Sequence, residues 1–146
     1  MRIAVVAPGA PQRPVAVDDL VTLDPAKKLT YDVLANDLRT PGTELHLAST
    51  DATEGTNVKQ RSDGIVTVQG GSGEPFQHVP YRATTGLHED TGELAIRYQE
   101  GYDNPPMAGI VVAHPEGDSS TTTVDVMTKV TDIDDSLEDL TVDAVK

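Results

Sequence analysis

The stretch from Pro14 to Leu47, PVAVDDLVTLDPAKKLTYDVLANDLRTPGTELHL, predicts three β-segments joined by turns. Leu29, Tyr31 and Val33 alternate with polar residues, which is the two-residue period of a half-buried strand. The segment 24–27, Asp-Pro-Ala-Lys, has proline at the second position of a type I turn. The opening of the chain therefore indicates a strand-and-turn protein.

A weaker copy of this stretch recurs about 93 residues later, from Pro106 to Val142. Three pairs of segments align at offsets of 92, 93 and 95 residues: 14–16 with 106–108, 32–34 with 125–127, and 45–47 with 140–142. A small drift is what short loop insertions produce, and a fixed period indicates a repeat architecture. We therefore expect the sequence to be a piece of a tandem array of β-domains.

Between the two copies, four further strands are expected, at 57–61, 65–69, 76–83 and 93–99. Asp63-Gly64 between the first two is a strong hairpin signal. Pro80 predicts that its strand lies at a sheet edge, contains a bulge, or begins just after the proline. About seven strands in roughly 90 residues favour an all-β fold, an immunoglobulin-like antiparallel β-sandwich.

The period divides the chain into three parts. Residues 1–12 are predicted to be the last strand and linker of a preceding repeat, because RIAVV at 2–6 takes the place that ELAIRY at 93–98 has before the second copy. Residues 13–100 form one complete repeat. Residues 101–146 are a linker and the first strands of a following repeat, expected at 110–113, 121–130 and 140–145.

Half a sandwich cannot close a core, which leaves three outcomes for the last part. It is disordered, it pairs with residues 2–6, or another molecule completes it in a domain-swapped or edge-paired homodimer. We favour ordered pairing, because the alternating apolar segment TTTVDVMTKV at 121–130 is a poor random coil.

Charge and composition exclude several classes of partner. The net charge is −13 and the sequence pI is about 4.4, so nucleic acid and anionic membranes are excluded as partners. Cysteine is absent, which excludes disulfides and thiol chemistry. No stretch approaches the 18 or more apolar residues of a membrane span, so membrane insertion is not expected here.

PVAVDD at 14–19 and DVLAND at 32–37 resemble the opening of the bacterial Ig-like, cadherin-like tandem repeats of large surface and secreted proteins. The resemblance covers about residues 13–99, with a weaker second start at 105–145. It implies an extracellular or cell-surface location and neighbouring repeats of the same chain as partners. The family often has an acidic run after the second motif. Here LRTPGTE at 38–44 replaces it, so if the run binds calcium in relatives, such a site is weakened or lost in this chain.

Two acidic groups are candidate Ca²⁺ ligands, the only cofactor expected. Asp132, Asp134 and Asp135 lie close together on a predicted turn, where carboxylates can converge on one ion. Asp18, Asp19 and Asp37 are a second set near a domain end. For both sets the alternative is a solvated acidic turn, the interpretation that we favour.

No pattern of nucleophile, base or metal ligands indicates catalysis, so an enzyme is not expected. The sequence favours a structural spacer or stalk repeat. One alternative is an adhesion module that binds a protein or glycan ligand through loops at one end of the sandwich. Another is an accessory domain of a large secreted enzyme. Aromatic residues make up only 3% of the chain, which argues against a flat aromatic platform for glycans.

Overall fold

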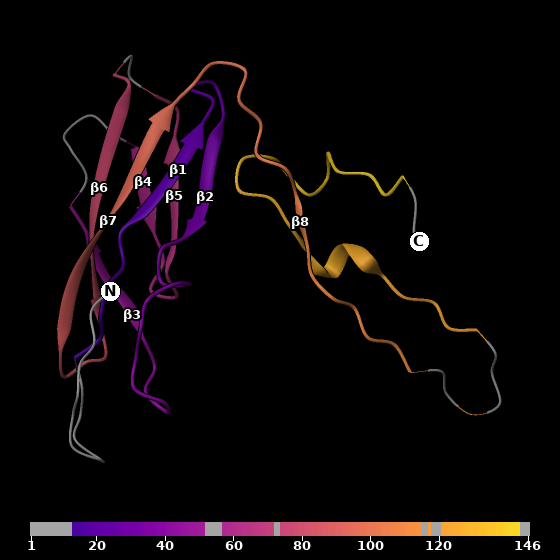
Figure 1. Ribbon diagram of the computed structural model, residues 1–146, viewed down its shortest axis with the longest axis horizontal. Helices are drawn as coiled ribbons and strands as arrows, with labels where there is room; N and C mark the ends of the chain where they lie inside the picture. Colours follow the sequence, from indigo (N-terminus) through magenta and orange to yellow (C-terminus); the bar gives the residue numbers. More distant parts are fainter. Residues whose placement is uncertain (1–12, 52–56, 72–73, 115–116, 118–120, 144–146) are drawn as a thin grey trace.

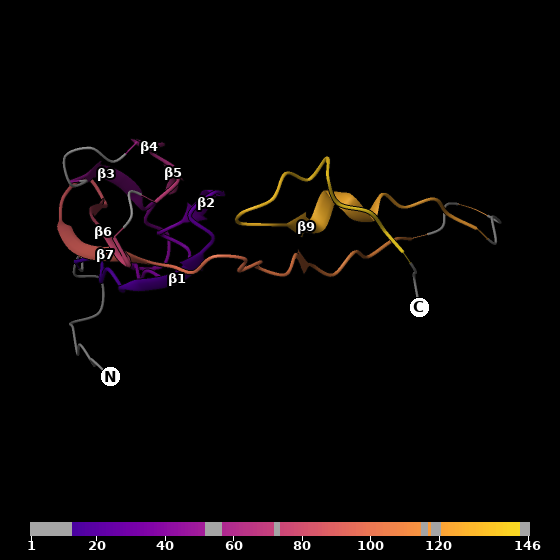
Figure 2. The same cartoon turned by 90° about the horizontal axis from the view of Figure 1, so that it is seen from above.

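The predicted strands between residues 14 and 99 assemble into two sheets in the computed structural model, which describes residues 13–51, 57–71, 74–114, 117 and 121–143. The strands are β1 (Asp19–Leu23), β2 (Lys28–Asp32), β3 (His46–Thr50), β4 (Asn57–Gln60), β5 (Ile65–Gln69), β6 (Phe76–Thr84) and β7 (Glu89–Tyr98). One sheet has the order β1-β7-β6-β3 and the other β2-β5-β4. The all-β, sandwich-like architecture is therefore confirmed (Figures 1 and 2).

The core lies between the two sheets, because each long strand turns every second residue inward. β6 alternates exposed and buried positions along its length. The buried apolar cluster contains residues of both sheets: Val21, Leu23, Leu29, Val33, Leu45, Leu47, Val66, Val68, Val79, Tyr81, Ala83, Leu94 and Ile96. Burying side chains of this size stabilises the fold by about 1.5–3 kcal/mol each. Within the first sheet β1 pairs with β7 in parallel, and the other pairs are antiparallel.

The hairpin predicted at Asp63-Gly64 is present between β4 and β5. Gly64 has φ +100°, a conformation that side-chain-bearing residues rarely adopt. The Arg61 N–H donates to the Ile65 carbonyl at 2.9 Å and closes the turn. A Cβ at Gly64 would also lie 2.5 Å from the Asp32 carboxylate, so this turn requires glycine for two reasons.

Pro80 lies inside β6, which has β7 on one side and β3 on the other. The prediction of an edge strand or a strand start is therefore wrong. The Pro80 carbonyl accepts from the Asp51 N–H at 2.8 Å, so the proline nitrogen also faces the β3 side of the strand. The ladder with β3 ends at the neighbouring pair of Thr50 and Tyr81, so the missing N–H removes at most one bond at the end of the ladder, to the Asp51 carbonyl.

A connector after β7 leads to a second body, the C-terminal unit, which comprises residues 106–143 (Figure 1). It contains β8 (Met107–Ala108) paired with β9 (Val130–Thr131), and a 3₁₀ helix, η1 (Val126–Lys129). We refer to residues 13–100 as the first unit. No helix among the described residues has the length and apolar character needed to cross a membrane.

Most of the strand expected in the C-terminal unit is not formed. Residues 110–113, 121–125 and 140–143 have no strand structure, and η1 occupies most of the rest of the expected strand 121–130. A strand needs a neighbour for its backbone hydrogen bonds, and the described part of this unit provides only the short β8–β9 pair. The predicted strand at 2–6 lies outside the described residues.

Local geometry recurs in the two units at the offsets found in the sequence. Val15 forms an isolated antiparallel bridge with Leu38, and Met107 pairs in the same way with Thr131. The turn at 33–36 and η1 at 126–129 also correspond. Before each, an aspartate Oδ1 accepts from the backbone N–H two residues on, at 3.0 Å in both cases: Asp32 from Leu34, and Asp125 from Met127.

Candidate functional site

A cluster of charged side chains lies where the first unit meets the C-terminal unit. The Lys27 ammonium contacts the carboxylates of Asp103, of Asp135 at 2.9 Å and of Asp134 at 3.5 Å. These four residues are called the junction cluster. Lys27 comes from the turn after β1, Asp103 from the connector, and the other two from the turn after β9.

Lys27 is positioned by the turn that the sequence predicts at 24–27. Its N–H donates to the Asp24 carbonyl at 2.9 Å, and the Ala26 N–H donates to Asp24 Oδ1 at 2.7 Å. The other oxygen of the Asp24 side chain accepts from the Gly101 N–H at 2.6 Å. Asp24 therefore shapes the turn and also ties the start of the connector to it.

Asn104 ties the connector to both units. Its side-chain amide donates to the Thr22 carbonyl of β1 at 2.9 Å and to Asp134 Oδ2 at 3.0 Å. Independently, the Thr30 N–H in β2 donates to the Ile133 carbonyl at 2.7 Å. The C-terminal unit is therefore attached to the first unit by main-chain and side-chain contacts at several points.

Of the first predicted metal set, Asp134 and Asp135 converge and Asp132 does not join them. Asp132 Oδ1 accepts from the backbone N–H groups of Asp134 and Asp135, both at 3.0 Å, and so shapes the turn that presents them. Asp103 takes the third place. Within the described residues, Asp103, Asp134 and Asp135 are the one group of three potential ligands whose atoms lie within 4.8 Å of one another.

The three carboxylates of this group are suitable ligands for Ca²⁺, but a lysine ammonium lies among them. The Asp134 side chain is fully buried and its Oδ1 has no hydrogen-bond partner. The Asp103 hydrogen bond and the neighbouring carboxylates hold the pKa of Lys27 well above its ordinary value, and Lys27 lowers the pKa of Asp103. The positive charge of this cluster is therefore supplied by the chain itself, and a divalent ion would compete with it.

The second predicted set, Asp18, Asp19 and Asp37, is distributed among separate structural hydrogen bonds. Asp19 Oδ1 accepts from the Tyr31 hydroxyl at 3.1 Å and the Asn36 amide at 2.8 Å. Burial raises the pKa of Asp19 to about 6 and also raises that of Asp37.

Asp37 Oδ1 accepts from the Val17 N–H at 2.8 Å and from the Tyr81 hydroxyl at 2.9 Å. Asp18 Oδ1 accepts from the Glu93 N–H at 3.1 Å. These carboxylates hold the segment before β1 against β6, β7 and the turn after β2. Each of the three carboxylates therefore has a structural role in the first unit.

The contact between Lys27 and Asp103 was not predicted from the sequence. They are 76 residues apart, and neither belongs to an acidic run or a recurring motif. The available signal was indirect, since the connector QEGYDNP had to pass close to the turn at 24–27 if β1 and β7 were neighbours.

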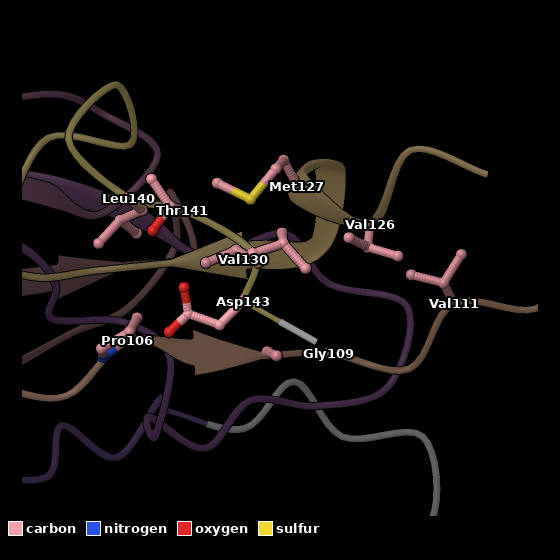
Figure 3. Close-up of a pocket in the computed structure, with 11 residues that line it drawn as sticks. Pro106, Gly109, Val111, Val126, Met127, Val130, Leu140, Thr141 and Asp143 are labelled. Carbon is pink, nitrogen blue, oxygen red and sulfur yellow. The ribbon is translucent and has the colours of Figure 1, made fainter. Parts of the chain in front are cut away.

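A pocket of about 520 Å³ opens in the C-terminal unit (Figure 3). Its lining is largely apolar and comes from β8, η1, β9 and the last described residues: Pro106, Ala108, Gly109, Val111, Val126, Met127, Val130, Leu140, Thr141, Val142 and Asp143.

Compared with known proteins, the chain matches no family model, no curated protein and no solved structure.

Proposed function

We propose that the chain is a non-catalytic structural spacer in which consecutive immunoglobulin-like β-sandwich repeats are held in a defined relative orientation. The observation that carries this proposal is the junction, where Lys27 and Asn104 connect β1, the connector and the turn after β9. A flexible linker would leave neighbouring units free to reorient. Contacts on both sides of the connector restrict that freedom.

The recurrence of local geometry supports a tandem arrangement. The bridge of Val15 with Leu38 and the pair of Met107 with Thr131 occur at the sequence offsets of 92 and 93 residues. The same two offsets relate PVAVDD and DVLAND, which resemble bacterial Ig-like repeats, to the start of the C-terminal unit. A multi-domain bacterial cell-surface or secreted protein is the setting that this resemblance favours.

The test is the relative orientation of the two units in solution. Residual dipolar couplings measured on the whole chain give an alignment tensor for each unit. If the units are held in a fixed orientation, the two tensors should agree in the wild-type protein. Different tensors in the wild type, together with fast backbone motion at residues 100–105, would contradict the spacer proposal.

The Lys27→Met variant removes the ammonium that joins the carboxylates of the connector and the C-terminal unit. Its two tensors should diverge, while the chemical shifts of the first-unit core remain unchanged. Lys28→Met is the matched control, because it removes the same charge from the next residue, which is exposed. Its tensors should agree as in the wild type.

A further inference from the structure

The outer face of the β1-β7-β6-β3 sheet is the surface that points away from the β2-β5-β4 sheet (Figure 2). On this face Leu20 of β1 is 72% exposed and Phe76 of β6 is 47% exposed. The alternation of buried positions along each strand places Pro80 of β6 and Ala95 of β7 on the same face. Apolar side chains from three neighbouring strands therefore gather on one exposed surface.

This outer face is electrically neutral in a strongly acidic chain. Its charged side chains are two arginines, Arg82 and Arg97, and two glutamates, Glu89 and Glu93. The outward-pointing residues of β1 and β3 add no charge while His46 is neutral. The whole chain carries −13, so all of its net charge lies elsewhere. A second copy of the chain is therefore repelled least from this face.

The order of residues along β7 makes the outer face complementary to itself. Arg97 and Glu93 lie two residues to either side of Ala95, and all three point outward. A two-fold axis that crosses the strands at Ala95 brings Arg97 of one copy opposite Glu93 of the other, twice in each pair. Arg97 is exposed and has no ion-pair partner within the described residues, so it is available for this contact.

The same symmetry is present in the apolar residues of β6. His78 is the neighbour of Ala95 in the ladder, and Phe76 and Pro80 lie two residues to either side of His78. The axis therefore packs the Phe76 ring against Pro80 of the other copy. Leu20, the β1 neighbour of Ala95, meets its own counterpart. An apolar and aromatic centre with paired charges beside it is the composition of a protein interface.

We propose that two copies of the chain associate through the outer face, with their β7 strands antiparallel and a two-fold axis at Ala95. The contact is isologous, so it closes at a dimer. His78 also meets its counterpart, and its ring contacts Glu93 Oε1 at 2.8 Å, which balances any charge there. β1 and β3 have only five residues each, so the dimer is weak and reversible and buries less than about 1,200 Å² in total.

This association goes beyond the spacer function and does not depend on it. The junction cluster and the C-terminal unit take no part in the contact, which uses β1, β6 and β7 of the first unit alone.

Sedimentation velocity of the whole chain, from micromolar to millimolar concentration, measures the association. The weight-average mass should rise from monomer towards dimer. Leu20→Lys places two ammonium groups opposite each other and should weaken association at least tenfold. Leu87→Lys is the matched control, because Leu87 is 77% exposed but lies in the turn between β6 and β7, and it should associate as the wild type does.

Two charge variants test the pairing across the axis. Arg97→Glu places a carboxylate opposite Glu93 of the other copy and should weaken association about tenfold. Adding Glu93→Arg to Arg97→Glu exchanges the two charges and restores opposite signs across the contact. The double variant should therefore recover most of the affinity that the single variant loses.

Cross-linking tests the position of the axis, because the chain has no cysteine of its own. Packed sheets lie about 10 Å apart, so a thiol cross-linker of that span should join two copies of Ala95→Cys. It should not join two copies of Thr91→Cys, since the antiparallel arrangement places them about 26 Å apart along the strands.

Three results would overturn the proposal. One is a wild-type monomer at every concentration. Another is association that Leu20→Lys leaves unchanged, which would place the contact on a different surface. The third is equal cross-linking of Ala95→Cys and Thr91→Cys. Agreement of the two alignment tensors is a separate outcome, because it concerns the two units within one copy. The amide spectrum of the first-unit core verifies folding in every variant.

Discussion

Replacing Asp19 by asparagine should stabilise the first unit, by an amount that grows with pH. The residue is 6% exposed, and its Oδ2 has no hydrogen-bond partner. Burial raises the pKa of Asp19 to about 6, from an ordinary value of 3.8. The folded protein therefore binds a proton at Asp19 more tightly than the unfolded chain does. This contribution to stability is present below pH 3.8 and is lost as the pH rises through 6.

The magnitude follows from the difference between the two pKa values. About two pH units, at 1.36 kcal/mol each, give up to roughly 3 kcal/mol at neutral pH and above. Asparagine carries no charge and keeps an oxygen that can accept from the Tyr31 hydroxyl. The advantage of Asp19→Asn over wild type should therefore be about 0.5 kcal/mol at pH 4 and about 2–3 kcal/mol at pH 8.

Urea denaturation of both proteins between pH 4 and pH 8 measures this difference, with the intrinsic circular dichroism of the sandwich as the signal. Asp18→Asn is the control, because it makes the same charge change at the preceding, exposed residue and keeps the acceptor for the Glu93 N–H. A stability difference between Asp19→Asn and wild type that is independent of pH, or that shrinks as pH rises, would refute the reasoning.

Three further predictions concern Tyr81 and the junction cluster. Gly92→Ala should cost about 1–3 kcal/mol in unfolding free energy by overpacking, because a Cβ there would lie 2.6 Å from the Tyr81 ring; an unchanged urea midpoint would contradict this. Tyr81→Phe removes the hydroxyl that donates to Asp37, so it should cost about 1–3 kcal/mol and raise the pKa of Asp37 further, which NMR titration of that carboxyl measures. Lys27→Met should bind Ca²⁺ at least tenfold more tightly than wild type in calorimetric titration, because the ammonium no longer competes for Asp134 and its neighbours; equal affinities would contradict competition between Lys27 and Ca²⁺.

Much of the first unit was predictable because its signals are local. The alternation of Leu29 with polar neighbours, the turn at 24–27 and the hairpin at Asp63-Gly64 each depend on residues next to one another. Pro80 shows the limit of such signals. Its cost depends on how many ladder bonds its missing N–H removes, and the ladder with β3 ends at the neighbouring pair of Thr50 and Tyr81.

The candidate site was predictable only in part. Asp134 and Asp135 are adjacent, so the sequence indicated a place where carboxylates gather. Asp132 was assigned to the same cluster, yet its carboxylate accepts backbone N–H groups of its own turn. Short-range hydrogen bonds of this kind compete with ligation, and spacing alone cannot separate the two roles.

The sequence by itself determined the strand pattern of the first unit, the turns between its strands and the 92- to 95-residue period, because each arises from neighbouring residues or from comparison of the chain with itself. Tertiary structure decided what the acidic residues contact. It placed Lys27 among Asp103, Asp134 and Asp135, and it buried Asp19 beside Tyr31. Lys27 and Asp103 are close only after β1 and β7 have paired, and the energies of all these contacts depend on burial and distance, which a linear pattern does not contain.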